Sequence, residues 1–261
     1  MLPKILKPFH INKSNLIRIG PKRDGGYVID KRVLSKTKAI VTLGLNDDWS
    51  FEKEFIKKNR ACKVYAYDHT VNNKYWIKRF KQDLVSFIKL KKLTPFKILD
   101  IFKYLDYLFF FSEKNTHFIK KIVANKKNSE EETIDRILGN LDNVILKVDI
   151  ENDEYKVLGD IIKNNSKINL LIIEFHQVNK NFNKIKKFIL NNNLKIIHLH
   201  ANNFGGLDKK GMPTTLEATF LNQNKFKTEN RRSKKEYPIK GLDYKNHRSK
   251  EEIKLKFYDR N

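Results

Sequence analysis

Short runs of apolar, mostly β-branched residues alternate along the chain with longer segments in which apolar residues recur every three or four positions. The runs are typical of buried parallel strands, and the longer segments are typical of helices. Strands are expected at 37–45, 62–67, 118–124, 216–221 and in three runs that end at Asp149, Glu174 and about His200, with helices at 51–59, 154–164 and 183–191. Strands that alternate with helices of this length predict an α/β fold with a doubly wound parallel sheet and right-handed crossovers.

Three segments depart from this alternation, within a chain (1–261) that we interpret as a single domain. Residues 73–117 are rich in lysine and aromatic residues and are too long for a simple crossover, so we expect a helical insertion that packs over the site or forms a dimer contact. Ser129 and Glu132 have capping-box spacing and predict a helix start. The tail, 228–261, is basic at its start, continues in a polar helical pattern, and is expected to be peripheral.

The most apolar stretch, 104–111 (YLDYLFFF), is far shorter than the ~20 residues that a membrane-spanning helix needs. We favour the buried face of a helix here over contact with a membrane surface or a partner. The start of the chain has no sustained apolar run, so no signal peptide is expected. The single cysteine, Cys62, cannot form an internal disulfide, which favours a reducing, cytoplasmic location.

The net charge of the chain indicates which classes of partner it attracts. The chain carries 54 Lys and Arg against 30 Asp and Glu, a formal net charge of +24, with 40% hydrophobic residues. This composition excludes a disordered chain and favours an anionic partner, which could be nucleic acid, acidic lipid or a phosphorylated metabolite. The alternative is that lysine and asparagine are simply abundant throughout the chain.

Acidic and imidazole side chains alternate at three strand ends. Asp149 with Glu151, Glu174 with His176, and His198 with His200 are each two residues apart, so each pair shares one face of its strand. Ligands bind beyond the carboxyl ends of the strands in open α/β sheets, so these pairs predict a catalytic site. Either Asp149, Glu174 and a histidine hold a divalent metal, or one histidine is a general base oriented by a carboxylate. The structural alternative is that the histidines are hydrogen-bonded core groups.

A cofactor site is expected at the ends of the first two strands. Gly44 opens the turn after the first strand, and Asp68 ends the second, where a carboxylate can hold a ribose diol. Asp47 and Asp48 in the turn would repel a pyrophosphate, so they favour a positively charged cofactor without phosphates, such as a sulfonium. The Asp24–Tyr27 segment (DGGY) by itself predicts only a hairpin turn.

Six strings, in order along about two hundred residues, resemble the FkbM-like family of S-adenosylmethionine-dependent methyltransferases. They are RIGPKRDGGYVI (18–29), VTLGLNDDWSFEKEF (41–55), VYAYDHT (64–70), LKVDIENDEYKVL (146–158), LLIIEFH (170–176) and HLHANN (198–203). The resemblance implies a Rossmann-like class I methyltransferase sheet of seven strands with the last strand antiparallel. That strand would separate His200 from Glu174 by about 9–10 Å. One departure is Asn152, which stands where the family has glycine and predicts a changed backbone after the fourth strand.

The resemblance also implies roles for individual residues. The expected cofactor contacts are Asp24, Gly26, Tyr27, Gly44, Asn46, Asp48, Asp68 and Asn125, with Asn125 near the adenine. The pairs at the strand ends, and not the resemblance, give the expected catalytic residues Asp149, Glu151, Glu174, His176 and His200 and the expected ligands of a Mg²⁺ or Mn²⁺ ion, Asp149, Glu174 and His200. Family members often methylate sugars or other components of surface polysaccharides, bacterial capsule among them.

The function that we expect is transfer of a methyl group, preferably to oxygen, on a small polar and anionic acceptor. A sugar hydroxyl or a phosphoramidate-type precursor in capsule biosynthesis would fit. The alternatives are an RNA methyltransferase, which the net charge suggests, and a non-catalytic scaffold at a membrane surface. The RNA alternative is disfavoured because the aromatic residues mostly lie in apolar helical or strand patterns.

Overall fold

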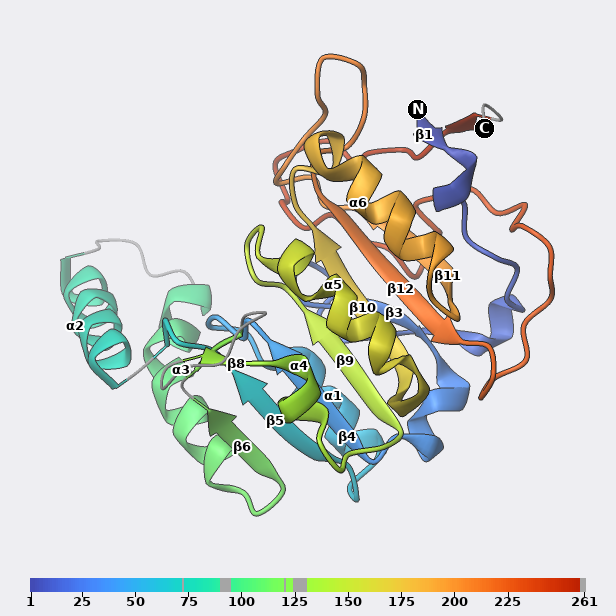
Figure 1. Cartoon of the computed structure of the whole chain (residues 1–261). Helices are drawn as coiled ribbons and strands as arrows, with labels where there is room; N and C mark the ends of the chain where they lie inside the picture. Colours follow the sequence, from blue (N-terminus) through green and yellow to red (C-terminus); the bar gives the residue numbers. More distant parts are fainter. Residues whose placement is uncertain (72, 90–94, 120, 124–130, 259–261) are drawn as a thin grey trace.

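A seven-stranded sheet forms the centre of the molecule (Figure 1). The computed structural model describes residues 1–71, 73–89, 95–119, 121–123 and 131–258. The strands lie in the order β11-β12-β10-β9-β4-β5-β6, and β12 is antiparallel to both of its neighbours. Their bounds are β4 Ala39–Leu43, β5 Lys63–Tyr67, β6 Thr116–Ile119, β9 Val144–Val148, β10 Ile168–Phe175, β11 Leu194–Ala201 and β12 Leu216–Asn222. This order, with its antiparallel last strand, confirms the predicted class I sheet.

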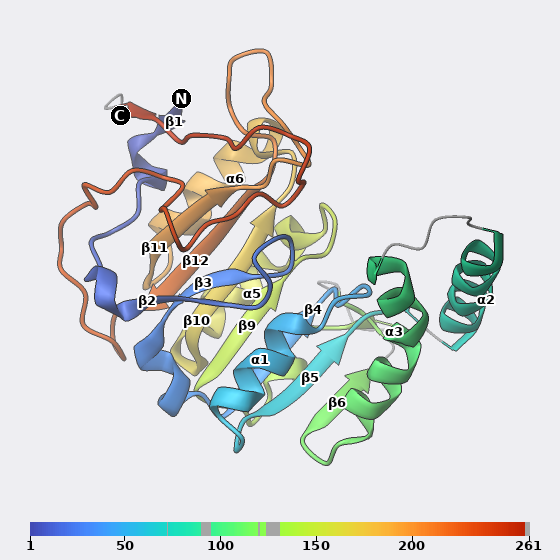
Figure 2. The same cartoon turned by 180° about the vertical axis from the view of Figure 1, so that it is seen from behind.

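Helices cover both faces of the sheet, which explains the near-continuous apolar strand sequences. One face carries α4 (Ile134–Leu138), α5 (Glu154–Lys163) and α6 (Val178–Leu190), as Figure 1 shows. The other face carries α1 (Ser50–Lys58) and the hairpin of β2 (Leu16–Ile19) and β3 (Tyr27–Asp30), as Figure 2 shows. Every residue of β4, β9, β10 and β12 is buried. The expected helices and the six longer strands are thus confirmed, with ends that shift by a few residues.

The segment expected as an insertion contains two helices, α2 (Asn73–Lys89) and α3 (Pro95–Ser112); α3 lies beside the edge strand β6, and α2 lies farther out, next to α3 (Figures 1 and 2). Trp76 of α2 packs against Tyr104 and Tyr107 of α3, with ring centroids 6.0 and 5.1 Å apart. Trp49, just before α1, contacts Trp76 and Tyr107, so these aromatic rings form a second small core. None of the helices in the described part of the chain is long and apolar enough to cross a membrane.

Residues between β6 and α4 differ from the prediction. The strand expected at 118–124 is split, because β6 ends at Ile119 and the separate β7 (Ile122–Val123) pairs with β8 (Glu131–Glu132). Helix α4 therefore begins only at Ile134, and its N-cap is Thr133, whose hydroxyl accepts a hydrogen bond from the Arg136 backbone amide. The predicted cap, Ser129, lies outside the described residues.

The tail also differs from the prediction, because residues 228–258 contain no helix. The tail crosses the molecule in extended and turn conformations and ends in β13 (Phe257–Tyr258), which pairs with β1 (Leu2–Pro3). Tyr237, Ile239 and Leu255 are buried, so the tail belongs to the core and is not peripheral. The remaining elements are the 3₁₀ helices η1 (Lys4–Leu6), η2 (Lys13–Asn15), η3 (Lys31–Lys36) and η4 (Asn165–Lys167).

Candidate functional site

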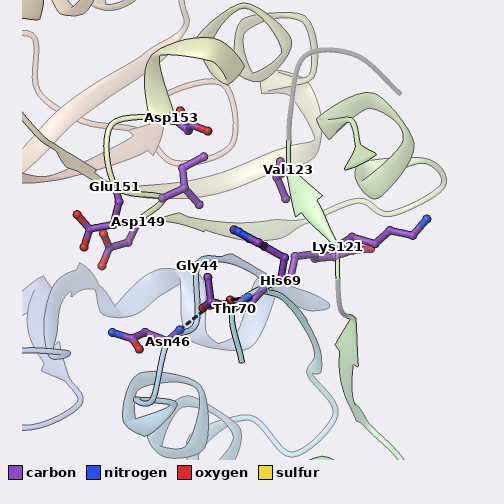
Figure 3. A pocket seen from close by; sticks show the side chains of 12 residues that line it. Gly44, Asn46, His69, Thr70, Lys121, Val123, Asp149, Glu151 and Asp153 are labelled. Atoms are coloured by element: carbon purple, nitrogen blue, oxygen red, sulfur yellow. Dashed lines mark hydrogen bonds between the residues drawn. The ribbon is translucent and has the colours of Figure 1, made fainter. Parts of the chain in front are cut away.

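A cavity of about 280 Å³ opens at the carboxyl ends of three neighbouring strands, β5, β4 and β9 (Figure 3). We call it the first cavity. Asp149 and Glu151 lie together at one side of it, and His69 and Lys121 lie at the other. Its lining residues are Gly44, Asn46, Tyr67, Asp68, His69, Thr70, Lys121, Val123, Asp149, Ile150, Glu151 and Asp153.

Backbone hydrogen bonds hold the loops around this cavity together just beyond the strand ends. The Gly44 amide donates to the Tyr67 carbonyl, and the Asp149 amide donates to the Leu43 carbonyl, both at 2.9 Å. Gly44 has a φ of +79°, and a Cβ atom there would lie only 1.8 Å from the Asp149 carbonyl oxygen. The glycine is therefore needed so that two loops of the protein can touch, and the sequence argument, which invoked only a ligand, did not foresee this contact.

Asp68 connects two of the loops. Its Oδ2 accepts a hydrogen bond from the Asn46 amide at 2.8 Å, and its Oδ1 accepts from the amide and hydroxyl of Thr70 at 2.7 and 2.6 Å. Only 6% of the residue is exposed, yet it lines the first cavity. A carboxylate oxygen has two acceptor sites, so Oδ2 can accept one more donor, such as a hydroxyl of a ligand.

A second cavity, of about 290 Å³, adjoins the first and shares Gly44, Asn46 and Asp149 with it. It lies under the DGGY loop and is lined by Arg23, Asp24, Gly25, Tyr27, Gly44, Leu45, Asn46, Asp47, Asp48, Lys103, Lys147, Asp149, Phe204 and Asn246. The structure therefore brings Asp24, Tyr27 and Asp48 to the site, as the sequence predicted. Gly26 is different: it does not line the cavity, and a Cβ atom there would lie 2.2 Å from the Pro21 carbonyl oxygen and 2.7 Å from the Arg18 guanidinium.

The two acidic residues after Gly44 have different surroundings. Asp47 forms ion pairs with Arg79 of α2 and with Lys103 of α3, the latter at 2.9 Å. Asp48 accepts a hydrogen bond from the Ser50 amide at 2.8 Å through Oδ1 and lies against Gly25 through Oδ2. The insertion thus neutralises Asp47, while Asp48 joins the start of α1 to the DGGY loop.

Four of the predicted catalytic residues meet at the ends of β9 and β10. The Nε2 atom of His176 lies 3.4 Å from a Glu174 oxygen, 3.7 Å from a Glu151 oxygen and 4.0 Å from an Asp149 oxygen. On the other side of the ring, Nδ1 lies 3.4 Å from the buried carboxylate of Glu154, which also accepts a hydrogen bond from the His176 amide at 2.7 Å. Glu174 accepts a hydrogen bond from the Asn202 side chain at 3.0 Å. The predicted cluster of Asp149, Glu151, Glu174 and His176 therefore exists.

The cluster shifts the pKa values of its members in ways that matter for proton transfer. Burial raises the pKa of Asp149 to about 6, against the lowering effect of His176 and Lys147. Burial and the neighbouring Asp149 raise the pKa of Glu174 well above its usual range. Burial alone would lower the pKa of His176, but the hydrogen bond to Glu154 and the charges of Glu154 and Asp149 raise it. Near neutral pH, Asp149 is therefore mostly ionised, while the raised pKa of Glu174 favours its protonated form more than in a free carboxyl.

His200 does not belong to this cluster, and its predicted catalytic and metal-binding roles are wrong. Its Nδ1 lies 3.1 Å from Glu217 of β12 and its Nε2 lies 3.0 Å from Glu252 of the tail. Burial alone would lower the pKa of His200, but these two carboxylates raise it to about 10. The ring is protonated at neutral pH and has no free nitrogen for a metal. His198 is likewise paired, with Asp243 at 3.1 Å.

Some residues of the site carried no signal in the sequence. The Asn246 side-chain amide donates to Asp24 at 2.9 Å and to Glu217 at 2.5 Å, so it joins the DGGY loop to β12. Lys147, buried in β9, lies 3.3 Å from Glu52 and 5.4 Å from the ring centroid of Tyr27. Asn246 is more than two hundred residues from Asp24 in sequence, so no local pattern could have paired them. The predicted adenine contact, Asn125, lies outside the described residues.

Asn152 adopts the backbone conformation that glycine would adopt. Its φ is +77°, and that of the preceding Glu151 is +48°. Asparagine tolerates the left-handed region better than most residues because its short polar side chain can hydrogen-bond locally. A left-handed turn after β9 is therefore formed without the glycine of the family motif.

Comparison with known proteins gives a family match. The model described as "Methyltransferase FkbM domain" matches residues 32–196, more than half of the chain. No curated protein matches the chain.

Three solved structures illustrate the structural likeness. The fibrillarin pre-rRNA processing protein of Methanococcus jannaschii is 10% identical, with 72% of this chain and 67% of that chain covered and a TM-score of 0.37. The precorrin-6y C5,15-methyltransferase of Geobacter metallireducens is 9% identical, with 73% of this chain and 84% of that chain covered and a TM-score of 0.37. Aeropyrum pernix fibrillarin with natively bound S-adenosyl-L-methionine is 9% identical, with 84% of this chain and 87% of that chain covered and a TM-score of 0.37. At these TM-scores the likeness supports no statement about ligand or substrate.

Proposed function

Because this chain belongs to the FkbM family of S-adenosylmethionine-dependent methyltransferases, we propose that it transfers a methyl group from that cofactor to a hydroxyl oxygen of a small polar acceptor. The observation that supports this most is the position of Asp149, which borders both cavities and has a pKa near neutrality. A general base works best when its pKa lies close to the working pH.

The first cavity suits the adenosine part of the cofactor. Asp68 has acceptor capacity for a ribose hydroxyl. The apolar side chains of Val123 and Ile150 line the same cavity, and the adenine ring of the cofactor can lie between these two side chains. The methionine part would pass Gly44 and Asn46, which line both cavities, and reach Asp24 and Tyr27 under the DGGY loop. The carboxylates of Asp24 and Asp48 there complement an ammonium or sulfonium charge.

When it is bound, the cofactor supplies an electrophilic methyl group, and the chain aligns the acceptor and removes its proton. The in-line geometry depends mainly on positioning. Asp149 accepts the hydroxyl proton as the new bond forms, and His176, 4.0 Å away, stabilises the ionised carboxylate before transfer. Burial raises the pKa of Glu174, which favours the protonated carboxyl, and this form can donate a hydrogen bond within the same cluster.

A sugar hydroxyl fits the second cavity better than a bare phosphate does. Asp149, on the side shared with the first cavity, can accept a hydrogen bond from a hydroxyl group, whereas the carboxylates of Asp149 and Asp24 would repel an anion. An anionic group elsewhere on the acceptor would have to approach Arg23, which also lines the cavity. We therefore propose a sugar of a surface-polysaccharide pathway, such as a capsule precursor in the cytoplasm, over a phosphoramidate-type acceptor.

The test is the Asp149→Asn variant, with sugars and nucleotide-linked sugars screened as acceptors of labelled methyl. We expect turnover to fall at least 100-fold, because the amide cannot accept the proton, while calorimetric affinity for S-adenosylhomocysteine stays within a few-fold. Unchanged turnover would contradict the role of Asp149. Absence of cofactor binding in the folded wild-type protein would contradict methyl transfer itself.

A divalent metal remains part of the proposal, on a revised set of ligands. Among the described residues, Asp149, Glu151 and His176 offer ligand atoms that all lie within 4.8 Å of one another. Two carboxylate oxygens and an imidazole nitrogen suit Mn²⁺, and oxygen-rich sets suit Mg²⁺. Activity that disappears after chelation and returns with Mn²⁺ or Mg²⁺ would support the metal, whereas full activity in chelator would assign proton removal to Asp149 alone.

An RNA acceptor is the competing possibility that the net charge suggests. Methyl transfer to generic RNA at physiological salt, with no transfer to any sugar, would favour it. We retain the sugar proposal because the second cavity is small and lined by hydroxyl-binding carboxylates.

A further inference from the structure

Helix α3 is apolar on two faces, although only one of them is covered. One face packs Tyr107 and Phe110 into the small aromatic core with Trp49 and Trp76. The opposite side exposes large apolar residues to solvent: Phe102 at 55%, Leu105 at 44%, Leu108 at 42% and Phe109 at 72%. We call these four residues the α3 face.

The four residues form one continuous stripe. Residues 102, 105 and 109 are spaced by three, four and seven positions, and 108 follows 105 by three, so the four side chains lie on one side of the helix. A surface helix of a globular protein normally carries polar residues on its outer side. A contiguous apolar stripe that is exposed instead marks a contact with a partner or a membrane.

Exposed positive charge lies on the helix next to this stripe. The sequence 73–112 contains nine lysine or arginine residues and three aspartates, and two of the nine, Arg79 and Lys103, pair with Asp47. On α2, which packs beside α3, Lys74, Lys78 and Lys81 are exposed. The same helix adds the exposed apolar residues Ile77, Phe80 and Val85.

We infer that the α3 face docks on a membrane surface rich in anionic lipid, with its apolar side chains among the acyl chains and the lysines at the headgroups. The charge pattern favours this occupant over a second copy of the chain. A symmetric dimer through this face would bring two lysine-rich rims together, and like charges oppose such contact. An anionic surface attracts the same lysines, by about 1 kcal/mol for each one near the surface. Contact of this kind needs no spanning helix.

The test is co-sedimentation of the protein with sucrose-loaded vesicles of phosphatidylcholine, alone or with 30% phosphatidylglycerol. We expect binding to the anionic vesicles, weakened at least tenfold by the double change Leu105→Ser and Phe109→Ser. The matched control is Leu190→Ser, which removes an apolar side chain that is 65% exposed on α6. Calorimetric binding of S-adenosylhomocysteine shows whether each variant is folded.

Each outcome decides the inference. A double variant that binds vesicles as well as the wild type does would overturn it, because general attraction of a basic protein then explains the binding. A wild-type dimer in light scattering that the double variant abolishes would also overturn it and assign the face to a second copy. The membrane contact is supported if the double variant loses vesicle binding, the Leu190→Ser variant keeps it, and the wild-type protein is monomeric.

Discussion

At the scale of single residues, the site depends on a few backbone positions that ordinary side chains do not favour. Gly44, Asn46, Glu151, Asn152 and Gln177 all have positive φ angles, and all follow the carboxyl ends of strands. Such positions cost free energy and persist where the surroundings impose them. They turn the chain sharply, so that side chains from several loops reach the same cavities.

Asn152 offers a direct measurement of this cost. We expect Asn152→Val to lower the free energy of unfolding by about 1–2 kcal/mol, because a β-branched residue is strained at positive φ. Asn152→Gly, the family residue, should stay within ~0.5 kcal/mol of the wild type, since glycine adopts this region freely. Urea unfolding measures both, and an equal loss in the two variants would show that the asparagine side chain matters more than the backbone.

The pKa of Asp149 predicts how the reaction depends on pH. Asp149 must be ionised to accept a proton, so kcat/KM should rise with pH through about 6 and level off above it. Glu174→Gln should slow the reaction only a few-fold, because the raised pKa of Glu174 favours the protonated carboxyl and the amide imitates that form. A flat profile between pH 5 and 7 would exclude Asp149 as the base.

At the scale of elements, the site is completed by long-range pairings that join the tail to the DGGY loop. Arg18 at the start of this loop donates hydrogen bonds to the carbonyls of Pro21 and Leu242, at 2.8 and 3.1 Å. Asn246 binds Asp24 and Glu217 together. The wall of the second cavity is thus held by side-chain hydrogen bonds and not by a strand ladder.

Asn246→Asp should make the stability of the contact between the tail and the DGGY loop depend on pH. It places a third carboxyl beside Asp24 and Glu217, which raises the carboxyl pKa values of the folded state above those of the unfolded chain. The folded state then retains a proton that the unfolded state releases above about pH 4. The loss of stability should therefore be small at pH 4 and grow toward pH 8. Asn246→Ala, which adds no charge, serves as the control, and an equal loss at both pH values in the Asp variant would contradict the explanation.

The sequence predicted well those elements whose own residues are apolar because the element is buried. The runs that became β9 and β10 are apolar throughout because both faces of each strand are covered. In contrast, β8 consists of two glutamates and exists only because β7 lies beside it. The polar helical pattern of the tail was misleading, because contacts such as the one from the Asn203 side chain to the His247 carbonyl hold the tail in a non-helical conformation. His200 was misassigned because spacing shows which face a residue shares but not which side chains pair with it, here Glu217 and Glu252.

At the scale of the whole molecule, ligand binding and folding are linked. If S-adenosylhomocysteine binds only the folded chain, a concentration of 100 times its Kd should raise the free energy of unfolding by about 2.7 kcal/mol. Asp68→Ala should lose most of this increase at the same concentration. It should also start from a lower baseline, because the amides of Asn46 and Thr70 lose their acceptor. Chemical unfolding with and without ligand separates the two effects, and an undiminished increase would exclude Asp68 from the cofactor site.

The wall formed by the DGGY loop and the tail has a consequence for synthesis on the ribosome. The described residues that line the first cavity all lie between Gly44 and Asp153, so they emerge early and close together. The second cavity also needs Phe204 and Asn246, and Asn246 must reach back to Asp24, which emerged more than two hundred residues before. In a nascent chain, every described residue that lines the first cavity is therefore synthesised before Phe204 and Asn246, which complete the second cavity.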